Sequence, residues 1–328
     1  MTERCANPPP SVSVIIVNWN AAAVIGACIT SLLGQDYPGQ VEIIVVDNAS
    51  TDASLHVLRA FDNRVLVVES AENLGFGKGN NVGSRVATGR YCLFLNPDTE
   101  FLAHDGLRRL VAGLQDPRIG IVAPRLMDPD GSTQQSCARV PTLANLTMAM
   151  LALPRLLPDA WRRRLSPVLW SHDRSTYTGW VSGACVLMRT DQYRQLGGFS
   201  ERTFMYGEDL ELGYRVGKSG LRVYYEWSVQ VCHSRDHSSA QRWTGSATAA
   251  RAAHGELTFL RERYSRPLAD VGRWALWAGY GARGRLLRRV GHHNRAAIYT
   301  AMAHALRKAP AMEPYPRRSR SSLGEVEQ

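Results

Sequence analysis

The sequence predicts an α/β protein in which helices cover both faces of a mostly parallel, doubly wound sheet. Short apolar runs at residues 12–17, 41–46 and 91–95 have the length and composition of strands that are buried on both faces. Segments with helical spacing of apolar residues lie between such runs, and this alternation is typical of parallel sheets with crossover helices. The 328 residues, 45% of them hydrophobic, suffice for one large domain with an appendage or for two domains.

The first half of the chain carries this alternation in order. A helix is expected from about residue 21 to 33, before the strand at 41–46. Ser50 or Thr51 is a candidate N-cap for the next helix. The remaining elements of this half are a strand at 65–68, a short helix ending near residue 87, the strand at 91–95 and a strand at 119–123.

After residue 123 the pattern is less regular. Residues 125–178 mix turn signals with an amphipathic stretch that carries arginines. Order returns with a loop and strand at 179–188, a helix at 207–218, a strand at 221–225 and a helical pattern from 239 onward. The two ends, residues 1–10 and 311–328, are expected to be a disordered leader and a disordered tail.

The cysteines and the hydropathy pattern predict a cytoplasmic protein. The six cysteines are scattered without a CxxC pair, so we expect buried thiols in a reducing compartment rather than disulfides or a zinc site. The first ten residues lack the apolar core of a signal peptide. The longest apolar stretch, at 143–153, falls short of the ~18 residues that span a bilayer.

The net charge of +10 is concentrated near the C-terminus. Residues 264–328 hold twelve Arg and Lys against four Asp and Glu, whereas residues 1–263 hold 27 against 25. Such a charge distribution informs us about partners rather than about the fold. Nucleic acid is not an expected partner, because the charge lies outside the motif-bearing body and no nucleic-acid-reading motif is present.

The strand at 91–95 ends abruptly at Asn96-Pro97-Asp98. Because Pro97 cannot donate to a ladder, pairing should stop there and leave Asp98 at the carboxyl end of the strand, where open α/β sheets bind ligands. A carboxylate at that edge suits Mg²⁺ or Mn²⁺ carrying a diphosphate. The alternative is a strand that ends in an ordinary turn.

Two more polar residues end strands at the same edge. Asn18 ends the first strand, and Asp47 ends the second. Either residue alone would more often belong to a turn or a helix cap. Three polar strand ends at one edge together favour a site for a polar ligand.

Residues 73–81 follow the third strand and contain Gly75, Gly77 and Gly79. Alternating glycines let a backbone approach a ligand closely. The segment matches neither the dinucleotide fingerprint nor a P-loop. The alternative is a plain turn into a helix.

Glu208 and Asp209 open the helix at 207–218. In the simplest interpretation these acids stabilise the helix N-terminus by charge–dipole attraction. In the functional interpretation one carboxylate is a general base whose pKa is raised by nearby aromatic side chains. His233, which follows a strand, is a candidate metal ligand near Asp98, and His237 is its competitor.

Taken together, these motifs resemble glycosyltransferase family 2, most of all its rhamnosyltransferase-type members, over residues 11–240. The motifs that occur in the family's order are residues 14–20, 45–52, 73–81, 94–99, 181–188 and 207–209, followed by His233. The resemblance implies a GT-A fold with a donor nucleotide half at 11–124 and an acceptor half at 125–240. It also implies a nucleotide-sugar donor and inversion at the anomeric carbon.

The resemblance also implies roles for individual residues. Asp209 is the expected catalytic base, and Asp98 and His233 are the expected ligands of a divalent cation, Mg²⁺ or Mn²⁺. The other expected site residues are Asn18, Asp47, Gly75, Asn80, Asn81 and Asn96 for the donor, with Asp47 facing its base, and Trp180, Gly183 and Glu208 on the acceptor side.

One position departs from the family pattern. Asn96 stands where the Asp-x-Asp motif has its first acid. The amide can still hydrogen-bond a ribose, but Asp98 is then the one carboxylate of the motif, so weaker metal affinity is expected. Rhamnosyltransferase-like members commonly show this Asn-Pro-Asp form.

Residues 241–310 are expected to form a basic helical appendage, interrupted by glycines at 279, 281 and 284. Tryptophans and aliphatic residues stand among arginines there, as in helices that lie on an anionic membrane surface. The alternative is a helix that packs on the catalytic domain and leaves a solvated basic face.

The sequence therefore predicts an inverting glycosyltransferase of cell-wall or polysaccharide assembly at the inner face of the cell membrane. The subgroup resemblance favours L-rhamnose transfer from dTDP-rhamnose to a saccharide or to a polyprenyl-diphosphate-linked acceptor. The alternatives are a UDP- or GDP-sugar donor and a non-catalytic protein that binds sugar nucleotides. Asp98 and Asp209 argue against the non-catalytic alternative.

Overall fold

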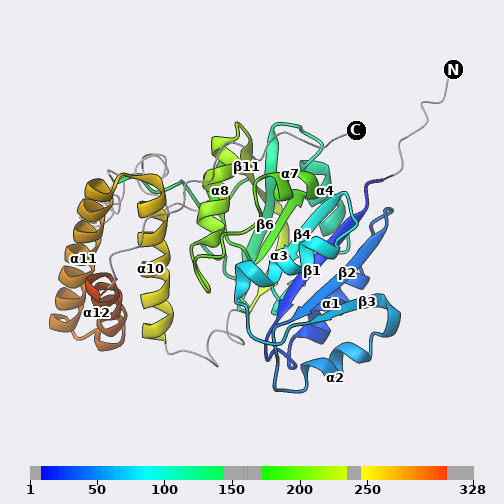
Figure 1. Ribbon diagram of the computed structural model, residues 1–328, viewed down its shortest axis with the longest axis horizontal. Coiled ribbons are helices and arrows are strands. Elements are labelled where there is room, and N and C mark those ends of the chain that lie inside the picture. The colour runs from blue at the N-terminus through cyan, green and yellow to red at the C-terminus, as the bar shows by residue number, and fades with distance from the viewer. Residues whose placement is uncertain (1–8, 144–157, 159–160, 162–171, 235–244, 309–328) are drawn as a thin grey trace.

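The computed structural model describes residues 9–143, 158, 161, 172–234 and 245–308 (Figure 1). The main sheet has the strand order β3-β2-β1-β4-β10-β6-β11-β5, and β8 also pairs with β11. Its strands are β1 (Val12–Asn18), β2 (Val41–Asp47), β3 (Val65–Glu69), β4 (Tyr91–Leu95), β5 (Thr99–Phe101), β6 (Ile119–Met127), β8 (Thr176–Thr178), β10 (Cys185–Arg189) and β11 (Arg222–His233). A separate pair is formed by β7 (Cys137–Ala138) and β9 (Trp180–Val181).

The predicted α/β class with a mostly parallel sheet is confirmed. Strands β1 to β4 are parallel to one another, and β10 is antiparallel to both β4 and β6. Strands β6 and β11, which pair in parallel, therefore share the direction of β1 to β4. Strands β5 and β8 run antiparallel to β11.

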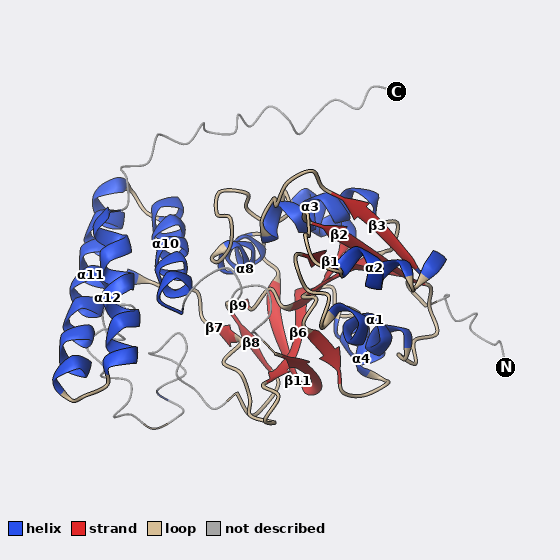
Figure 2. Ribbon diagram, turned by 90° about the horizontal axis from the view of Figure 1, so that it is seen from below, coloured by secondary structure: helices blue, strands red, loops and turns tan. Residues whose placement is uncertain are grey.

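The sheet buries a core on each face. Successive strand residues point to opposite faces, so Val14 and Ile16 of β1 enter one core while Ile15 enters the other. The first core is covered by α1 (Ile25–Leu33), α2 (Ser54–Arg59) and α4 (Gly106–Gly113), and the second by α3 (Phe76–Val86), α7 (Thr190–Gln195) and α8 (Glu208–Lys218). Figure 2 shows α1 and α4 on the side of the sheet opposite α3.

Four boundaries differ clearly from those that the sequence predicts. Helix α1 begins at Ile25, four residues later than expected. Neither Ser50 nor Thr51 caps α2, whose N-cap is Ala53, because the Ser50 hydroxyl donates to Asp47 Oδ1 instead (2.6 Å). Strands β6 and β11 run past their predicted ends because they pair with each other over most of their length.

Three C-terminal helices form a bundle beside the sheet domain (Figure 1). They are α10 (Gly245–Arg263), α11 (Arg266–Arg289) and α12 (His293–Lys308). Their shared core includes Leu257, Leu276 and Leu306. Helix α10 joins the bundle to the body: Phe259 packs edge-on against Tyr214 of α8 (ring centroids 5.4 Å apart).

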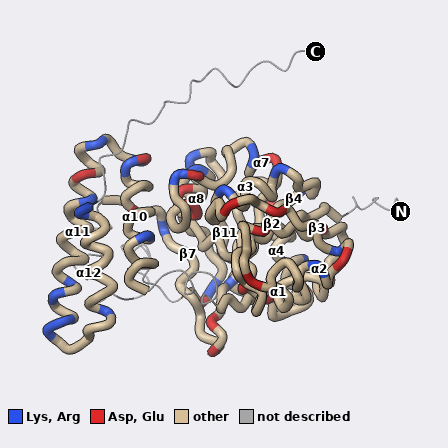
Figure 3. Tube along the Cα trace, turned by 60° about the horizontal axis from the view of Figure 1, so that its bottom comes forward, with Lys and Arg blue, Asp and Glu red and all other residues tan. Residues whose placement is uncertain are grey.

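The expectation that glycines interrupt the appendage is wrong. Helix α11 continues through residues 279, 281 and 284. A Cβ at Gly284 would lie 3.0 Å from Thr300 Oγ1 of α12, so this glycine permits close helix packing instead of ending the helix. The predicted basic character is seen in Figure 3, where Lys and Arg recur along α11 and α12.

Several predictions lie outside the described residues. They concern the leader at 1–8, almost all of the apolar stretch at 143–153, most of the arginine-bearing stretch after it, His237 and the tail at 311–328. Across the part of the chain that is described, no helix is long and apolar enough to cross a membrane. The described cysteines are free, and Cys28, Cys92 and Cys185 are buried as predicted. Cys137 is buried as well, whereas Cys232, which was also expected to be buried, is only half-buried.

Helix α3 packs very closely on the sheet through its glycines. A Cβ at Gly79 would lie 2.9 Å from Val17 Cγ1, and one at Gly83 would lie 2.5 Å from Ile15 Cγ2. A Cβ at Gly77 would lie 2.6 Å from the Ser200 carbonyl oxygen. Gly77 and Gly79 therefore make room for the protein itself and not for a ligand.

We expect Gly83→Ala to lower the free energy of unfolding by about 1–3 kcal/mol, because the added methyl overlaps a buried β-branched side chain that cannot move away. Gly217→Ala in α8 is the matched control. A Cβ there meets nothing within 4 Å, so it should leave stability unchanged or raise it by up to about 1 kcal/mol. Urea unfolding measures both, and equal effects would contradict the close packing of α3.

Candidate functional site

A cavity of about 710 Å³ opens at the carboxyl edge of β1 and β4. Its walls come from the turn after β4, the loop before α3, the turn before β10, residues 204–209 and the first turn of α10. Eight of the predicted site residues line it: Gly75, Asn96, Asp98, Trp180, Gly183, Glu208, Asp209 and His233. Residues distant in sequence thus meet where parallel strands end, as expected for a ligand site.

Asn18 and Asp47 lie at this edge of the sheet but do not line the cavity. They are paired in register on β1 and β2, and their side chains are 0% and 2% exposed. Asp47 Oδ1 accepts hydrogen bonds from Asn18 Nδ2 (2.8 Å) and Ser50 Oγ (2.6 Å), and its Oδ2 accepts one from the Ser50 N–H (3.0 Å). The pair holds the turn at 48–50, and direct contact with a nucleoside stays a prediction.

Asn48 is a cavity residue that the sequence analysis missed. It is 1% exposed, and its Nδ2 donates to the Gly75 carbonyl oxygen (3.1 Å). Its Oδ1 accepts no hydrogen bond from any residue that the structure describes. A buried amide oxygen without a partner is costly, so this atom is a candidate acceptor for an N–H or O–H group of a ligand. The only feature of the sequence that could have indicated this role for Asn48 is its position directly after Asp47, at the end of a strand.

Asp98 and His233 stand side by side at the cavity. His233 Nε2 lies 3.5 Å from Asp98 Oδ1, and the two side chains are 12% and 8% exposed. Gln134 determines the protonation of the ring, because its Nε2 donates to Asp128 Oδ1 and the His233 carbonyl (2.7 Å each), which leaves its Oε1 to accept from His233 Nδ1–H (3.0 Å). The Nε2 lone pair therefore points to the Asp98 side.

This pair fits a divalent cation with two protein ligands. Among the described residues, no group of three or more His, Cys, Asp or Glu is placed to hold a metal ion, so a substrate would have to complete the coordination. Asn96 Nδ2 lies 3.2 Å from His233 Nε2, and a cation would compete with that hydrogen bond. Asn96 is therefore expected to lower the affinity of this pair for a cation, because its amide is uncharged and because it hydrogen-bonds to His233 Nε2.

Glu208 and Asp209 are neighbouring carboxyl groups, the first buried and the second half-buried at the cavity wall. Glu208 is 5% exposed, and burial followed by the neighbouring Asp209 charge raises its pKa. Burial also raises the pKa of Asp209, against the hydrogen bonds that its carboxylate accepts from the N–H groups of Leu210 (2.8 Å) and Gly183 (3.2 Å). Glu208 also accepts a hydrogen bond from the Thr203 hydroxyl (3.3 Å), but the Asp209 charge raises the pKa of Glu208 further, so Asp209 is the member of the pair better suited to carry the negative charge.

Residues 204–209 are held between two close backbone contacts. A Cβ at Gly75 (φ 80°) would lie 2.2 Å from the Phe204 carbonyl oxygen. On the other side Gly207 (φ 98°) meets Gly255 of α10, where a Cβ would lie 2.4 Å from the Tyr206 carbonyl oxygen. Tyr206 itself has φ 75°, a strained conformation for a side chain of its size.

Helix α10 is consequently part of the site. Gly245 and Thr248 in its first turn line the cavity, and Gly255 contacts the segment that carries Asp209. The predicted catalytic domain, which ended at residue 240, left this helix out. No local sequence pattern in α10 predicts that this helix lines the cavity, because its position there depends on contacts with residues that are distant in sequence.

Asn80 and Asn81, which were predicted to line the donor site, do not line this cavity. Asn81 Nδ2 donates to the Phe199 carbonyl and to Glu201, and its Oδ1 accepts from the Tyr193 hydroxyl and the Phe199 N–H. All four hydrogen-bonding positions of that amide are occupied by the chain itself. Asn80 Nδ2 donates to the Phe76 carbonyl in the first turn of α3.

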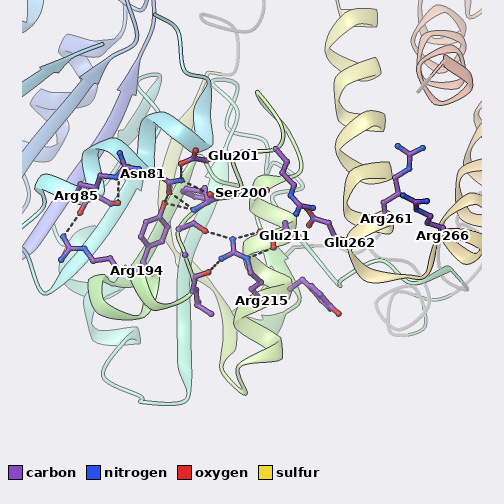
Figure 4. Close-up of a pocket in the computed structure, with 18 of the residues that line it drawn as sticks. Asn81, Arg85, Arg194, Ser200, Glu201, Glu211, Arg215, Arg261, Glu262 and Arg266 are labelled. Atoms are coloured by element: carbon purple, nitrogen blue, oxygen red, sulfur yellow. Dashed lines mark hydrogen bonds and ion pairs between the residues drawn. The ribbon is translucent and has the colours of Figure 1, made fainter. Parts of the chain in front are cut away.

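A larger cavity of about 1180 Å³ lies between α8, α7 and α3 on one side and the bundle on the other (Figure 4). Arginines dominate its lining, but several are bound to the protein: Arg215 pairs with Glu211, and Arg202 pairs with Glu262 (2.7 Å). None of the predicted catalytic or metal-binding residues lines it. The smaller cavity is therefore the candidate catalytic site.

Comparison with known proteins identifies the family of the chain. Residues 13–154 match the family model for glycosyl transferase family 2. The chain is 31% identical over 266 residues to the N-acetylglucosaminyl-diphospho-decaprenol L-rhamnosyltransferase of Mycobacterium tuberculosis H37Rv, covering 75% of this chain and 83% of the relative. It is 26% identical over 186 residues to the rhamnosyltransferase WbbL of Escherichia coli K12, covering 52% and 66%.

A solved structure shows the same fold. The mannosyltransferase PcManGT from Pyrobaculum calidifontis, in complex with GDP-Man and Mn²⁺, matches with a TM-score of 0.58 and 21% identity, covering 92% of this chain and 86% of that one. The chain thus belongs to glycosyl transferase family 2. It is a glycosyltransferase with a GT-A fold, and the expectations of family, fold and enzyme class are confirmed.

We expect Glu208→Gln to stabilise the protein increasingly as the pH rises. A carboxyl group whose pKa is raised by folding contributes stability below its unfolded pKa and loses that stability as the pH rises through the folded pKa. The neutral variant avoids this loss, so its advantage should grow between pH 5 and pH 9 by at least about 1 kcal/mol, which corresponds to one pKa unit.

Urea unfolding at several pH values measures this difference. Glu100→Gln on β5 removes a solvent-exposed carboxylate and serves as the control. An advantage of Glu208→Gln that stays constant across the range would show that Glu208 ionises at its ordinary pKa.

Proposed function

We propose that the enzyme transfers L-rhamnose from dTDP-L-rhamnose, with inversion, to a saccharide on a polyprenyl diphosphate during cell-wall or polysaccharide assembly. The observation that carries the proposal is the single cavity in which Asp209 lies with the Asp98–His233 pair. The relatives support the sugar and the acceptor: both are named as rhamnosyltransferases, and the mycobacterial one acts on a decaprenyl diphosphate. The buried free thiols support a cytoplasmic site of action.

Asp209 is the proposed catalytic base. As the acceptor hydroxyl oxygen bonds to the anomeric carbon, its proton passes to the Asp209 carboxylate, and the bond from that carbon to the diphosphate oxygen breaks on the opposite face. The N–H groups of Gly183 and Leu210 hold the carboxylate in one orientation. Burial makes the carboxylate more basic than an exposed aspartate, which favours proton transfer near neutral pH.

Asp98 and His233 would hold a divalent cation. When bound there, the cation would supply positive charge to offset the charge that develops on the departing diphosphate. In the neutral ring, Gln134 places the proton of His233 on Nδ1, so the Nε2 lone pair is the one available to a cation. Behind them Asn18 and Asp47 support the turn that carries Asn48, and we assign this part of the cavity to the nucleoside.

We expect Asp209→Asn to lower the rate of rhamnosyl transfer by a factor of roughly 10²–10⁴, because the amide cannot accept the proton. Binding of dTDP-rhamnose should persist, and thermal stabilisation by the donor measures it. Asp191→Asn is the matched control, since Asp191 also lies in the first turn of a helix but not at the cavity.

Near-normal transfer by Asp209→Asn would reject Asp209 as the base. Comparing stabilisation by dTDP-, UDP- and GDP-sugars tests the donor separately. A clear preference for a UDP- or GDP-sugar would overturn the rhamnose proposal and leave the mechanism standing.

We expect Gln134→Leu to raise the Mn²⁺ concentration that gives half-maximal binding by a factor of roughly 10–100, because His233 loses the partner that orients it. Electron paramagnetic resonance of free Mn²⁺, titrated in the presence of the nucleoside diphosphate, measures that binding. Gln115→Leu, an exposed position outside the cavity, should behave as the parent does. Unchanged Mn²⁺ binding in Gln134→Leu would argue against His233 as a ligand.

A further inference from the structure

We propose that the outward face of α11 docks on a bilayer that contains anionic lipids. We define this face by Leu268, Val271, Trp274, Leu286 and Val290, together with the alanines at 275, 278 and 282. This inference rests on the proposed function in one respect: an acceptor on a polyprenyl diphosphate lies in a membrane, and this is what would make membrane docking useful to the enzyme. Its evidence comes from α11 and from the helices packed beside it.

The outward face is mostly exposed and mostly apolar: Ala275 is half-buried, and Arg285 and Arg289 stand beside it at its C-terminal end. Its large side chains are between 48% and 61% exposed, and they are five of the eleven exposed large hydrophobic side chains in the described part of the chain. The positions 268, 271, 275, 278, 282, 286 and 290 follow one another at steps of three or four, which places them on one face of a helix. At the rise of an α-helix this stripe is about 33 Å long.

The opposite face of α11 is already buried. Leu276 and Tyr280 pack with Leu257 of α10 and Leu306 of α12 in the bundle core. A helix that is apolar on two faces normally buries both of them. Figure 1 shows α10 between α11 and the sheet domain, so the body lies on the other side of the bundle. Within the described residues nothing covers the outward face.

The charge around this face suits an anionic surface. From residue 271 to 308 the chain has eight Arg and Lys and no Asp or Glu. Arg285 and Arg289 are exposed beside Leu286 at the C-terminal end of the stripe, and Figure 3 shows the basic residues of α11 and α12. Basic side chains beside an apolar face hold a helix on anionic lipids. A second copy of the chain would instead bring like charges together.

The helix would lie along the bilayer and not cross it. No helix among the described residues is long and apolar enough to span a membrane. Trp274, which is half exposed, combines an apolar ring with a polar N–H, as side chains at membrane interfaces do. The buried face of α11 would remain in the bundle, so docking needs no unfolding.

Docking through α11 would hold the catalytic domain beside the membrane with the bundle between them. Helix α10 packs against α11 in the bundle core, and its first turn lines the cavity through Thr248. The bundle therefore links the proposed membrane surface to the candidate site. An acceptor whose lipid stays in the bilayer could then present its saccharide to Asp209.

The test is cosedimentation of the full-length chain with vesicles of phosphatidylcholine, with and without phosphatidylglycerol. We expect binding to the anionic vesicles, weaker binding at high salt, and a blue shift of tryptophan fluorescence. The double variant Val271→Ser/Leu286→Ser should bind about tenfold more weakly or worse. Arg285→Gln/Arg289→Gln should lose most of the preference for phosphatidylglycerol.

The matched control is Leu66→Ser/Leu102→Ser, which removes two equally exposed leucines (51% and 56%) from the sheet domain and should bind as the parent does. Stabilisation by the sugar nucleotide, measured in every variant, shows that the fold is intact and tests the proposed function independently. Vesicle binding that is absent in the parent, or unchanged in both α11 variants, overturns the docking proposal. A parent that dimerises in sedimentation experiments, while Val271→Ser/Leu286→Ser stays monomeric, overturns it in favour of a second copy.

Discussion

The position of Asp209 depends on residues 204–209, which lie in close contact with the backbone of Gly75 on one side and that of Gly255 on the other. On one side Gly75, which precedes α3, leaves room for the carbonyl of Phe204, and on the other Gly255 of α10 leaves room for the carbonyl of Tyr206. The segment therefore contacts the donor half of the domain and the C-terminal bundle at once. Few conformations satisfy both contacts, and the strained backbone of Tyr206 is consistent with that restriction. The helix that begins at Glu208 then delivers its carboxyl groups to the cavity.

The electrostatics of the cavity follow from burial. Two adjacent carboxyl groups stand at one wall of the cavity, and Asp209, which accepts hydrogen bonds from the N–H groups of Gly183 and Leu210 and raises the pKa of Glu208, is the one better suited to carry the charge. Across the cavity, Asp98 is the only acid of the Asn96-Pro97-Asp98 segment. Cation binding there therefore also needs His233, which Gln134 orients. The site thus combines one base with a cation-binding pair of modest charge, a combination suited to a substrate that brings its own phosphates.

The sequence predicted what local patterns encode. Each strand that ends in Asn18, Asp47 or Asp98 is a compact apolar run with a polar terminus, so both the sheet and its ligand edge could be inferred. The roles of Gln134 and α10, the use of Asn81 within the framework and the continuity of α11 through its glycines could not. Each depends on a partner that is distant in sequence, and no periodicity or spacing reveals such a partner. A glycine that faces solvent and one that faces Thr300 look alike in the sequence.

The central claim is that the half-buried Asp209 takes the proton of the acceptor. The most direct measurement is the pH dependence of the single-turnover transfer rate with the donor bound and the acceptor saturating. If the claim holds, the rate rises with pH through a pKa above the ordinary value of an aspartate, because the base must lose its proton before it can accept another. A rate that does not change across the acidic range, or that rises at the pKa of an exposed aspartate, would contradict it.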